Sequence, residues 1–225
     1  MSFIITKDLT KHYHLGKTLV YALRGVDMTI SKGEYLCIAG PSGAGKSTFL
    51  NLVGLLDRPT SGEIWFDGQP VHLMSPKVFH RFRKEKVSFI FQSFNLVPVL
   101  NAYENIEFPL LVKKIPKVER ERRIDALTEE VGIREWLKHR PDEMSGGQRQ
   151  RVAIARALVT KPEVVIADEP TANLDSITGR TILDLMRRLN KEEKTTFLIA
   201  SHDGTLMKEA DRIIRITDGT LEAPR

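Results

Sequence analysis

Gly40-Pro41-Ser42-Gly43-Ala44-Gly45-Lys46-Ser47 is the stretch that decides the fold, because its spacing, G-x-x-x-x-G-K-[ST], is that of a phosphate-binding loop. An apolar run at 35–39 precedes it, and a helix-like run at 48–56 follows it. The glycines let successive backbone N–H groups turn toward an anion, and the following helix adds the positive end of its dipole. The sequence therefore predicts a nucleoside triphosphate site, with Lys46 on the β- and γ-phosphates and the Ser47 hydroxyl on Mg²⁺.

Length and composition are those of a folded protein with a substantial core. The chain has 225 residues, which suits one large or two small domains, and 41% of them are hydrophobic. Its 34 Lys and Arg against 29 Asp and Glu give a net charge of +5. This excess is compatible with ATP, nucleic acid or an anionic membrane face, but the interspersed signs favour ordinary solubility. Basic clusters at 81–86 and 113–123 alternate with Glu and are expected to be solvated helix faces.

The single cysteine, Cys37, lies inside the apolar run before the loop, so the chain can form no internal disulfide and suits a reducing cytosol. No segment reaches the roughly 18 to 20 apolar residues that a membrane span needs. The start of the chain does not have the pattern of a secretory signal. We therefore expect any role at a membrane to depend on a partner.

The rest of the chain alternates strands with helices. Apolar residues at 26, 28 and 30 alternate with polar ones, which predicts a half-buried strand in the first part. Residues 101–140 are rich in Glu, Lys, Arg and Leu at helical spacing, and predict a helical insertion. Short apolar strands at 163–167 and 196–200 flank an amphipathic helix at 177–189. This alternation predicts an α/β fold with a mainly parallel sheet.

Asp168 and Glu169 directly follow one of these buried strands, which puts them at the carboxyl edge of the sheet, where ligands bind in open α/β folds. Asp168 can hold Mg²⁺, through water, and Glu169 is the candidate to orient or deprotonate an attacking water. The alternative is a solvent-exposed acidic pair at a strand end. A phosphate-binding loop upstream in the same chain makes that alternative the less favoured one.

Ser145-Gly146-Gly147-Gln148 has the S-x-x-Q spacing of a capping box and predicts the start of a helix that continues through 149–158. A glycine pair at a helix N-terminus exposes N–H groups and can form a second anion site. On local chemistry alone, a plain capped helix is the simpler interpretation.

Together these segments resemble the ATP-binding cassette (ABC) ATPases, over essentially the whole chain and in the family's order. Ser145 to Gln148 match the family signature, with Met144 where leucine is usual. The resemblance implies a P-loop NTPase (RecA-like) core with a mainly parallel sheet, an N-terminal antiparallel β subdomain and an inserted α-helical subdomain at about 95–160, in a single domain of residues 1–225. It also implies a head-to-tail dimer with a second copy of the chain. In that dimer Ser145 and Gly147 of one chain grip the γ-phosphate held by the other.

Other family positions carry over one at a time. Tyr13 looks like the aromatic residue that stacks on adenine, Gln92 like the glutamine that touches Mg²⁺ and the water, and His202 like the histidine at the γ-phosphate. Asn173-Leu174-Asp175 resembles the loop that crosses the dimer. The expected catalytic residues are thus Lys46, Gln92, Glu169 and His202, and the expected Mg²⁺ ligands are Ser47, Gln92 and Asp168. The expected nucleotide contacts are Tyr13, Gly40, Pro41, Ser42, Gly43, Ala44, Gly45, Lys46, Ser47 and Thr48, with Ser145, Gly146, Gly147, Gln148 and Asp175 contributed by the second chain.

The stretches at 55–62 and 91–105 resemble the branch that contains lipoprotein-release, macrolide-export and cell-division ATPases. This implies an ATP-hydrolysing subunit that transmits force to a separate transmembrane permease, at the cytoplasmic face of the inner (plasma) membrane. Apolar residues at 94–100 are expected to line a groove for the permease's coupling helix, with packing into the core as the alternative.

Two other functions remain open at this point. One is a cell-division ATPase that regulates cell-wall enzymes through its membrane partner. The other, more remote, is an ABC ATPase associated with nucleic acid. The chain has no long coiled-coil insertion, zinc cysteines or second cassette, so no nucleic-acid partner is expected.

Overall fold

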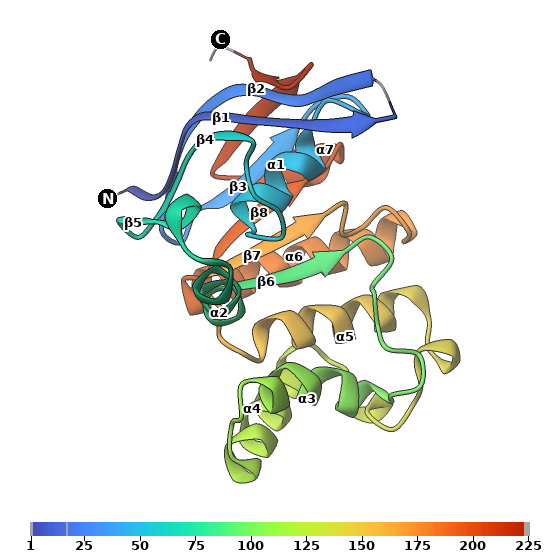
Figure 1. The fold of residues 1–225 in the computed structure, drawn as a ribbon. Helices are drawn as coiled ribbons and strands as arrows, with labels where there is room; N and C mark the ends of the chain where they lie inside the picture. The colour runs from blue at the N-terminus through green and yellow to red at the C-terminus, as the bar shows by residue number, and fades with distance from the viewer. Residues whose placement is uncertain (1, 17, 223–225) are drawn as a thin grey trace.

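The computed structural model describes residues 2–16 and 18–222, which fold into two sheets and a set of helices (Figure 1). The first sheet is antiparallel, in the order β2-β1-β4-β5. Its strands are β1 Ser2–Leu15, β2 Thr18–Ser31, β4 Ser61–Phe66 and β5 Gln69–Pro70. This is the N-terminal antiparallel β subdomain that the family resemblance implies.

The second sheet has the order β10-β9-β3-β8-β7-β6, and β10 is its antiparallel edge strand. The strands from β9 to β6 pair in parallel. They are β3 Tyr35–Ala39, β6 Val87–Phe91, β7 Val164–Asp168, β8 Thr196–Ala200 and β9 Arg212–Thr217, with β10 Thr220–Leu221. The expected mainly parallel core is confirmed.

Seven α-helices connect and cover the strands in the described part of the chain: α1 Lys46–Val53, α2 Pro76–Lys86, α3 Ala102–Val112, α4 Lys117–Glu130, α5 Gly146–Leu158, α6 Ser176–Glu193 and α7 Gly204–Glu209. Short 3₁₀ turns lie at Val71–Leu73, Arg134–Trp136 and Pro141–Glu143. In Figure 1, α3 and α4 lie at the end of the molecule opposite the antiparallel sheet, and α5 runs between them and β6. Helices α3 to α5 fall within the range expected for the helical insertion. That residues 1–225 form a single domain stays a prediction.

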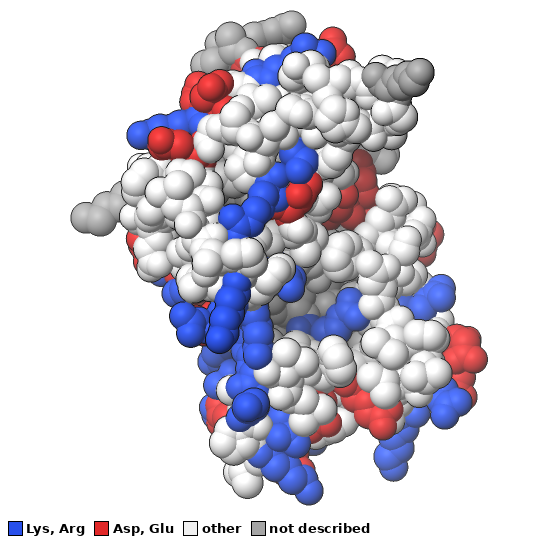
Figure 2. Space-filling view, viewed as in Figure 1, with Lys and Arg blue, Asp and Glu red and all other residues white. Residues whose placement is uncertain are grey.

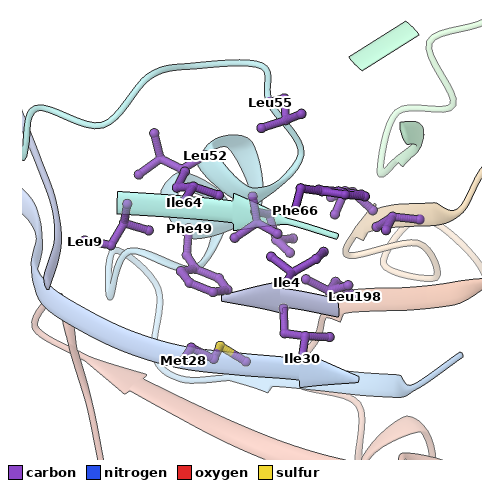
Figure 3. Packing of buried hydrophobic residues seen from close by; sticks show 14 of the residues in the cluster. Ile4, Leu9, Met28, Ile30, Phe49, Leu52, Leu55, Ile64, Phe66 and Leu198 are labelled. Carbon is purple, nitrogen blue, oxygen red and sulfur yellow. The ribbon is translucent and has the colours of Figure 1, made fainter. Parts of the chain in front are cut away.

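Helix α1 is packed between the two sheets (Figure 3). Its Phe49 and Leu52 are fully buried, against Ile4 of β1, Ile64 of β4 and Leu198 of β8. Complete burial of a side chain of this size is worth about 1.5–3 kcal/mol. The packing therefore anchors the first turn of α1, and with it the glycine-rich loop that precedes the helix.

Strand β3 is apolar at every position because both faces of the parallel sheet are covered. Leu36 and Ile38 face the core shared with α1, whereas Tyr35 and Cys37 face a second core formed with α5 and α6. Parallel strands buried on both faces have this continuous apolar pattern. Burial raises the pKa of the Cys37 thiol to about 11, in keeping with a small core residue.

Candidate active site

The strand register brings the predicted site residues to one edge of the parallel sheet. Asp168, at the end of β7, pairs with Phe91 of β6 on one side and with Ala200 of β8 on the other. Ala200 in turn pairs with Ile38 of β3. The residues that follow these strands are Gln92, Glu169, Ser201-His202 and the glycine-rich loop after Ala39. They therefore emerge side by side at the carboxyl edge, where open α/β sheets bind ligands.

Two glycines of the loop are required by close backbone approaches. Gly40 has φ 147° and Gly45 has φ 105°, in the region that side chains disfavour. A Cβ atom at Gly40 would lie 2.1 Å from the carbonyl oxygen of Ile216, and one at Gly45 would lie 2.4 Å from that of Ala22. Gly43, at φ 77°, has open space around its Cβ position. Neighbouring backbone therefore packs against the loop at Gly40 and Gly45, whereas the space at Gly43 is open.

Lys46, the first residue of α1, turns its side chain back over the loop. Its Nζ donates hydrogen bonds to the carbonyl oxygens of Gly40 at 2.8 Å and Pro41 at 2.9 Å. Ser47 lies beside it and is exposed at the mouth of the loop. That Lys46 contacts phosphate and that Ser47 contacts Mg²⁺ stay predictions.

Glu169 and His202 are in direct contact. Nδ1 of His202 lies 3.0 Å from Oε1 of Glu169, and the histidine side chain is 78% exposed whereas the glutamate side chain is 19% exposed. Glu169 has φ 47°, and its N–H donates to the carbonyl of Ala200 at 3.0 Å. A left-handed conformation at a non-glycine residue costs of order 1–3 kcal/mol and is typical of functional sites.

Tyr13 is held by two side chains that the sequence analysis did not single out. Its hydroxyl donates to Oδ2 of Asp57 at 3.2 Å, and Nζ of Lys11 lies 2.7 Å from the same carboxylate and 5.0 Å from the centre of the ring. Burial raises the pKa of Tyr13, while a hydrogen bond with Thr48 lowers it. The ring therefore has a fixed place next to the first turn of α1. Asp57 lies in the 55–62 stretch, which was interpreted only as a mark of the family branch.

Ser145 and Gln148 form the predicted capping box at the start of α5. The Ser145 hydroxyl accepts from the N–H of Gln148 at 3.3 Å, and Oε1 of Gln148 accepts from the N–H of Ser145 at 2.7 Å. The two glycines between them pack against the next segment of the chain: a Cβ at Gly147 would lie 2.5 Å from Cγ2 of Thr178, and one at Gly146 would lie 3.2 Å from Leu174. Packing within one chain therefore disfavours a side chain at Gly147 and leaves little room for one at Gly146.

Asp175 has a role within its own chain that the sequence analysis did not assign. It is the N-cap of α6, and its Oδ1 accepts from the N–H groups of Ile177 at 3.1 Å and Thr178 at 3.0 Å. The hydrogen bonds from Thr178 and Ile177 lower the pKa of the Asp175 carboxyl. The expected contribution to a second chain stays a prediction.

Comparison with known proteins identifies the family. Residues 23–172 match the family model described as ABC transporter. The chain is 47% identical over 215 residues to an uncharacterised ABC transporter ATP-binding protein of Thermotoga maritima, covering 96% of this chain and 92% of that protein. It is 43% identical over 217 residues to the lipoprotein-releasing system ATP-binding protein LolD of Pseudomonas fluorescens, covering 96% of each. It is also similar to the ATP-binding cassette MJ0796, solved as a dimer in a post-hydrolysis state with ADP and phosphate, with TM-score 0.90, 40% identity, and coverage of 98% and 97% of the two chains.

The chain belongs to the ABC transporter family. It is an ATPase subunit of that family, and the P-loop NTPase fold expected from the sequence is confirmed. The part of this ABC ATPase that the structure describes contains no helix that is both long enough and apolar enough to span a bilayer.

The arrangement of residues 91–105 in this ABC ATPase differs from the apolar groove that the sequence predicted at 94–100. Phe94 turns inward and is buried, whereas Val99 is 72% exposed. The side chain of Asn105, which is fully buried, bonds to the backbone of Val97, Leu100 and Asn101. The apolar residues here are therefore divided between the interior and the surface, and Phe94 does not line an exposed groove.

Residues 81–86 of the ABC ATPase lie on α2 and residues 117–123 on α4, as expected, whereas Lys113 and Lys114 precede α4 and Lys113 is partly buried. Figure 2 shows Lys and Arg side chains gathered at the lower left of the molecule, where Figure 1 places these two helices. On α4, Arg122 and Arg123 both bond to Glu119, and these bonds hold the pKa of Glu119 at about 2. Such paired charges suit a solvated helix face.

Proposed function

We propose that two copies of this ABC ATPase bind two ATP molecules head to tail and hydrolyse them, and that this cycle drives a separate transmembrane permease subunit at the cytoplasmic face of the membrane. One observation carries the proposal: the glycine-rich loop, Gln92, Asp168, Glu169 and His202 converge at a single sheet edge, with Glu169 and His202 in contact at 3.0 Å. These are the groups that positioning and charge stabilisation of a phosphoryl group require.

Each side chain at the edge has a distinct task. The triphosphate enters the loop, and Lys46 exchanges its bonds to the Gly40 and Pro41 carbonyls for stronger, charge-assisted bonds to phosphate oxygens. Glu169 accepts a proton from water as the water attacks the γ-phosphorus in line with the leaving oxygen. His202 holds the Glu169 carboxylate in place and stands beside the developing charge. A positioned general base of this kind contributes about 10² to 10⁴ in rate.

The residues at the edge suit Mg²⁺ as the metal. Ser47 offers a hydroxyl, Gln92 an amide oxygen and Asp168 a carboxylate, and hard oxygen donors of this kind are the ones that Mg²⁺ selects. Residues 2–16 and 18–222 hold no cluster of three or more His, Cys, Asp or Glu side chains at metal-binding distance. Water and phosphate oxygens would then complete the coordination shell, and the ion would neutralise charge on the transferred phosphoryl group.

The second half of each site comes from the partner copy. Ser145, Gly146, Gly147 and Gln148 present the capped N-terminus of α5, where N–H groups and the helix dipole favour an anion. The work that closure performs is lipoprotein release or export by transmission of force to the permease. The relative in Pseudomonas fluorescens supports this choice, because it is named for a lipoprotein-releasing system.

The proposal is tested with the full chain, first as purified protein and then in its own membranes. Phosphate release is measured with and without Mg²⁺, and the mass of the Glu169→Gln variant is followed by light scattering as ATP is added. A tagged chain is then purified from detergent-solubilised membranes. We expect Mg²⁺-dependent hydrolysis, an ATP-dependent dimer, and co-purification of a permease. The proposal is overturned if the variant stays monomeric when ATP is added. It is also overturned if the chain binds DNA in a salt-sensitive manner and no membrane partner co-purifies.

A further inference from the structure

Three backbone carbonyls just after β6 are held by side chains from elsewhere in the chain. Nδ2 of Asn173 donates to the carbonyl of Gln92 at 2.9 Å. The guanidinium of Arg156 donates to the other two, from Nη2 to the carbonyl of Phe94 at 2.7 Å and from Nη1 to that of Asn95 at 2.5 Å. The segment 92–95, which begins with a proposed catalytic residue, is thus fixed from outside.

The backbone conformation of this segment explains why it needs external support. Phe94 has φ 62° and Asn95 has φ 48°, so two successive non-glycine residues are left-handed. Side chains disfavour that region, and such turns persist only where their surroundings over-determine them. Arg149 adds to the restraint, because its guanidinium lies 5.0 Å from the centre of the Phe94 ring.

Arginine is suited to this position because of its shape. A planar guanidinium donates from two nitrogens in fixed directions, so that one nitrogen serves the carbonyl of Phe94 and the other that of Asn95. Burial lowers the pKa of the Arg156 guanidinium, as expected for a cation taken from water and held by neutral carbonyls. One guanidinium therefore holds both carbonyls of the left-handed turn.

The supporting side chains come from the segments that face the partner copy in the proposed function. Arg156 and Arg149 lie on α5, which begins at Ser145, and Asn173 lies two residues before Asp175. We propose that Arg156 and Asn173 are positioning residues: they fix Gln92 to α5 and to the 173–175 loop, so that closure of the dimer on α5 sets Gln92 in the other site of the same chain. This inference rests on the proposed role of Gln92.

Arg151 provides a matched control on the same helix. Its Nη1 donates to the carbonyl of Val131 at 2.5 Å, at the end of α4, so it also holds a backbone carbonyl but does not touch the Gln92 segment. Arg156→Gln and Arg151→Gln therefore remove similar contacts from the same helix, and only the first releases residues 94 and 95.

The test measures kcat, KM for ATP, nucleotide affinity and Tm for Arg156→Gln, Arg151→Gln, Asn173→Ala, Gln92→Ala and the Arg156→Gln/Gln92→Ala pair in the full chain. We expect Arg156→Gln to lower kcat about ten- to hundredfold with unchanged nucleotide affinity, since small misplacements have effects of this size. Asn173→Ala lowers kcat in the same direction, and Arg151→Gln does not. In the Gln92→Ala background the Arg156 substitution has little further effect, because residues acting through one group are not additive.

These variants distinguish an error in the proposed role of Gln92 from an error in the positioning role of Arg156 and Asn173. If Gln92→Ala keeps full kcat, the proposed role of Gln92 is wrong, and the inference falls with it. If Gln92→Ala lowers kcat but the Arg156→Gln effect equals that of Arg151→Gln, or multiplies in the double variant, the positioning role alone is wrong. Should Arg156→Gln not fold, Asn173→Ala with the same Gln92→Ala pairing decides, because Asn173 is exposed at the surface.

Discussion

Nδ1 of His202 lies 3.0 Å from Oε1 of Glu169, although 33 residues separate the two in the chain. They meet because β7 and β8 are parallel neighbours in register, with Asp168 opposite Ala200. The contact restricts rotation of the Glu169 carboxylate. In the proposed function Asp168 serves the metal and Glu169 the attacking water.

Glu169→Gln is expected to bind ATP but to release phosphate at least about a hundredfold more slowly, because the amide keeps the shape of the side chain and cannot accept the proton. The variant should also accumulate an ATP-bound dimer. Phosphate-release kinetics and light scattering measure the two effects. Near-normal turnover would show that Glu169 is not the base. Slow turnover without a dimer would be consistent with Glu169 as the base and would contradict the head-to-tail arrangement.

Gly147→Ala is expected to reduce turnover and stability together, because the new Cβ would lie 2.5 Å from Cγ2 of Thr178. Overpacking of this kind typically costs about 1–3 kcal/mol and would push the start of α5 away from the 173–178 segment. Chemical denaturation and ATPase assays measure the loss.

The Gly147→Ala/Thr178→Ser pair is the matched control for this clash. Serine removes the methyl group that the new Cβ would meet and keeps a hydroxyl. The pair should therefore recover most of the stability that Gly147→Ala loses. If it also recovers turnover, the glycine serves mainly packing within the chain. If turnover stays low, close contact with the partner's nucleotide is the stronger requirement at Gly147.

Local pattern was enough to predict the elements that carry the site. The glycine spacing at 40–47 predicted the loop, and the apolar run before Asp168 predicted a strand, because one short sequence window determines each of these features. Their meeting at one edge followed from the parallel sheet. The capping box at Ser145 was equally local, and it is confirmed.

Residues whose partners are distant in sequence could not be predicted in this way. Asp57 binds Tyr13 across 44 residues, and Arg156 binds Phe94 across 62. No periodicity relates such pairs, because they meet through packing of separate elements. The left-handed turn at Phe94 and Asn95 was also missed, since glycine and asparagine mark such positions and Phe94 is neither.

Asp57→Ala is expected to raise KM for ATP while leaving kcat at saturation nearly unchanged, because Asp57 holds the Tyr13 hydroxyl and not the reacting phosphate. Base stacking on an aromatic ring is worth about 1–3 kcal/mol, so Tyr13→Ala sets the upper limit of the effect. Tyr13→Phe keeps the ring and loses the same hydrogen bond. It should raise KM in the same direction and by no more than Asp57→Ala, which also removes the ion pair with Lys11. A lowered kcat with unchanged KM would contradict this role for Asp57.

Asp211→Asn is expected to lower stability at neutral pH and to make little difference in acid. Asp211 precedes β9, and its carboxylate accepts from the N–H of Tyr35, at the start of β3, at 2.9 Å and from the guanidinium of Arg187. The hydrogen bond from Arg187 lowers the pKa of Asp211 below its ordinary value. A carboxyl whose pKa is lower in the folded protein stabilises the fold above its unfolded pKa of about 3.9, and this contribution is lost as pH falls through the folded value.

The stability difference between wild type and Asp211→Asn should therefore be constant near neutral pH and shrink steadily once the pH falls below about 5. Denaturant unfolding of both proteins at a series of pH values measures it, and taking the difference removes the contributions of other carboxyls. Because the Asp211 side chain is 42% exposed, solvent screens the pair and the difference should be modest. Because β3 leads directly into the phosphate-binding loop, Asp211→Asn should also bind nucleotide more weakly than wild type near neutral pH. This difference in affinity should shrink in acid, as the stability difference does. A stability difference that does not change with pH would mean that packing around Asp211 matters more than its charge.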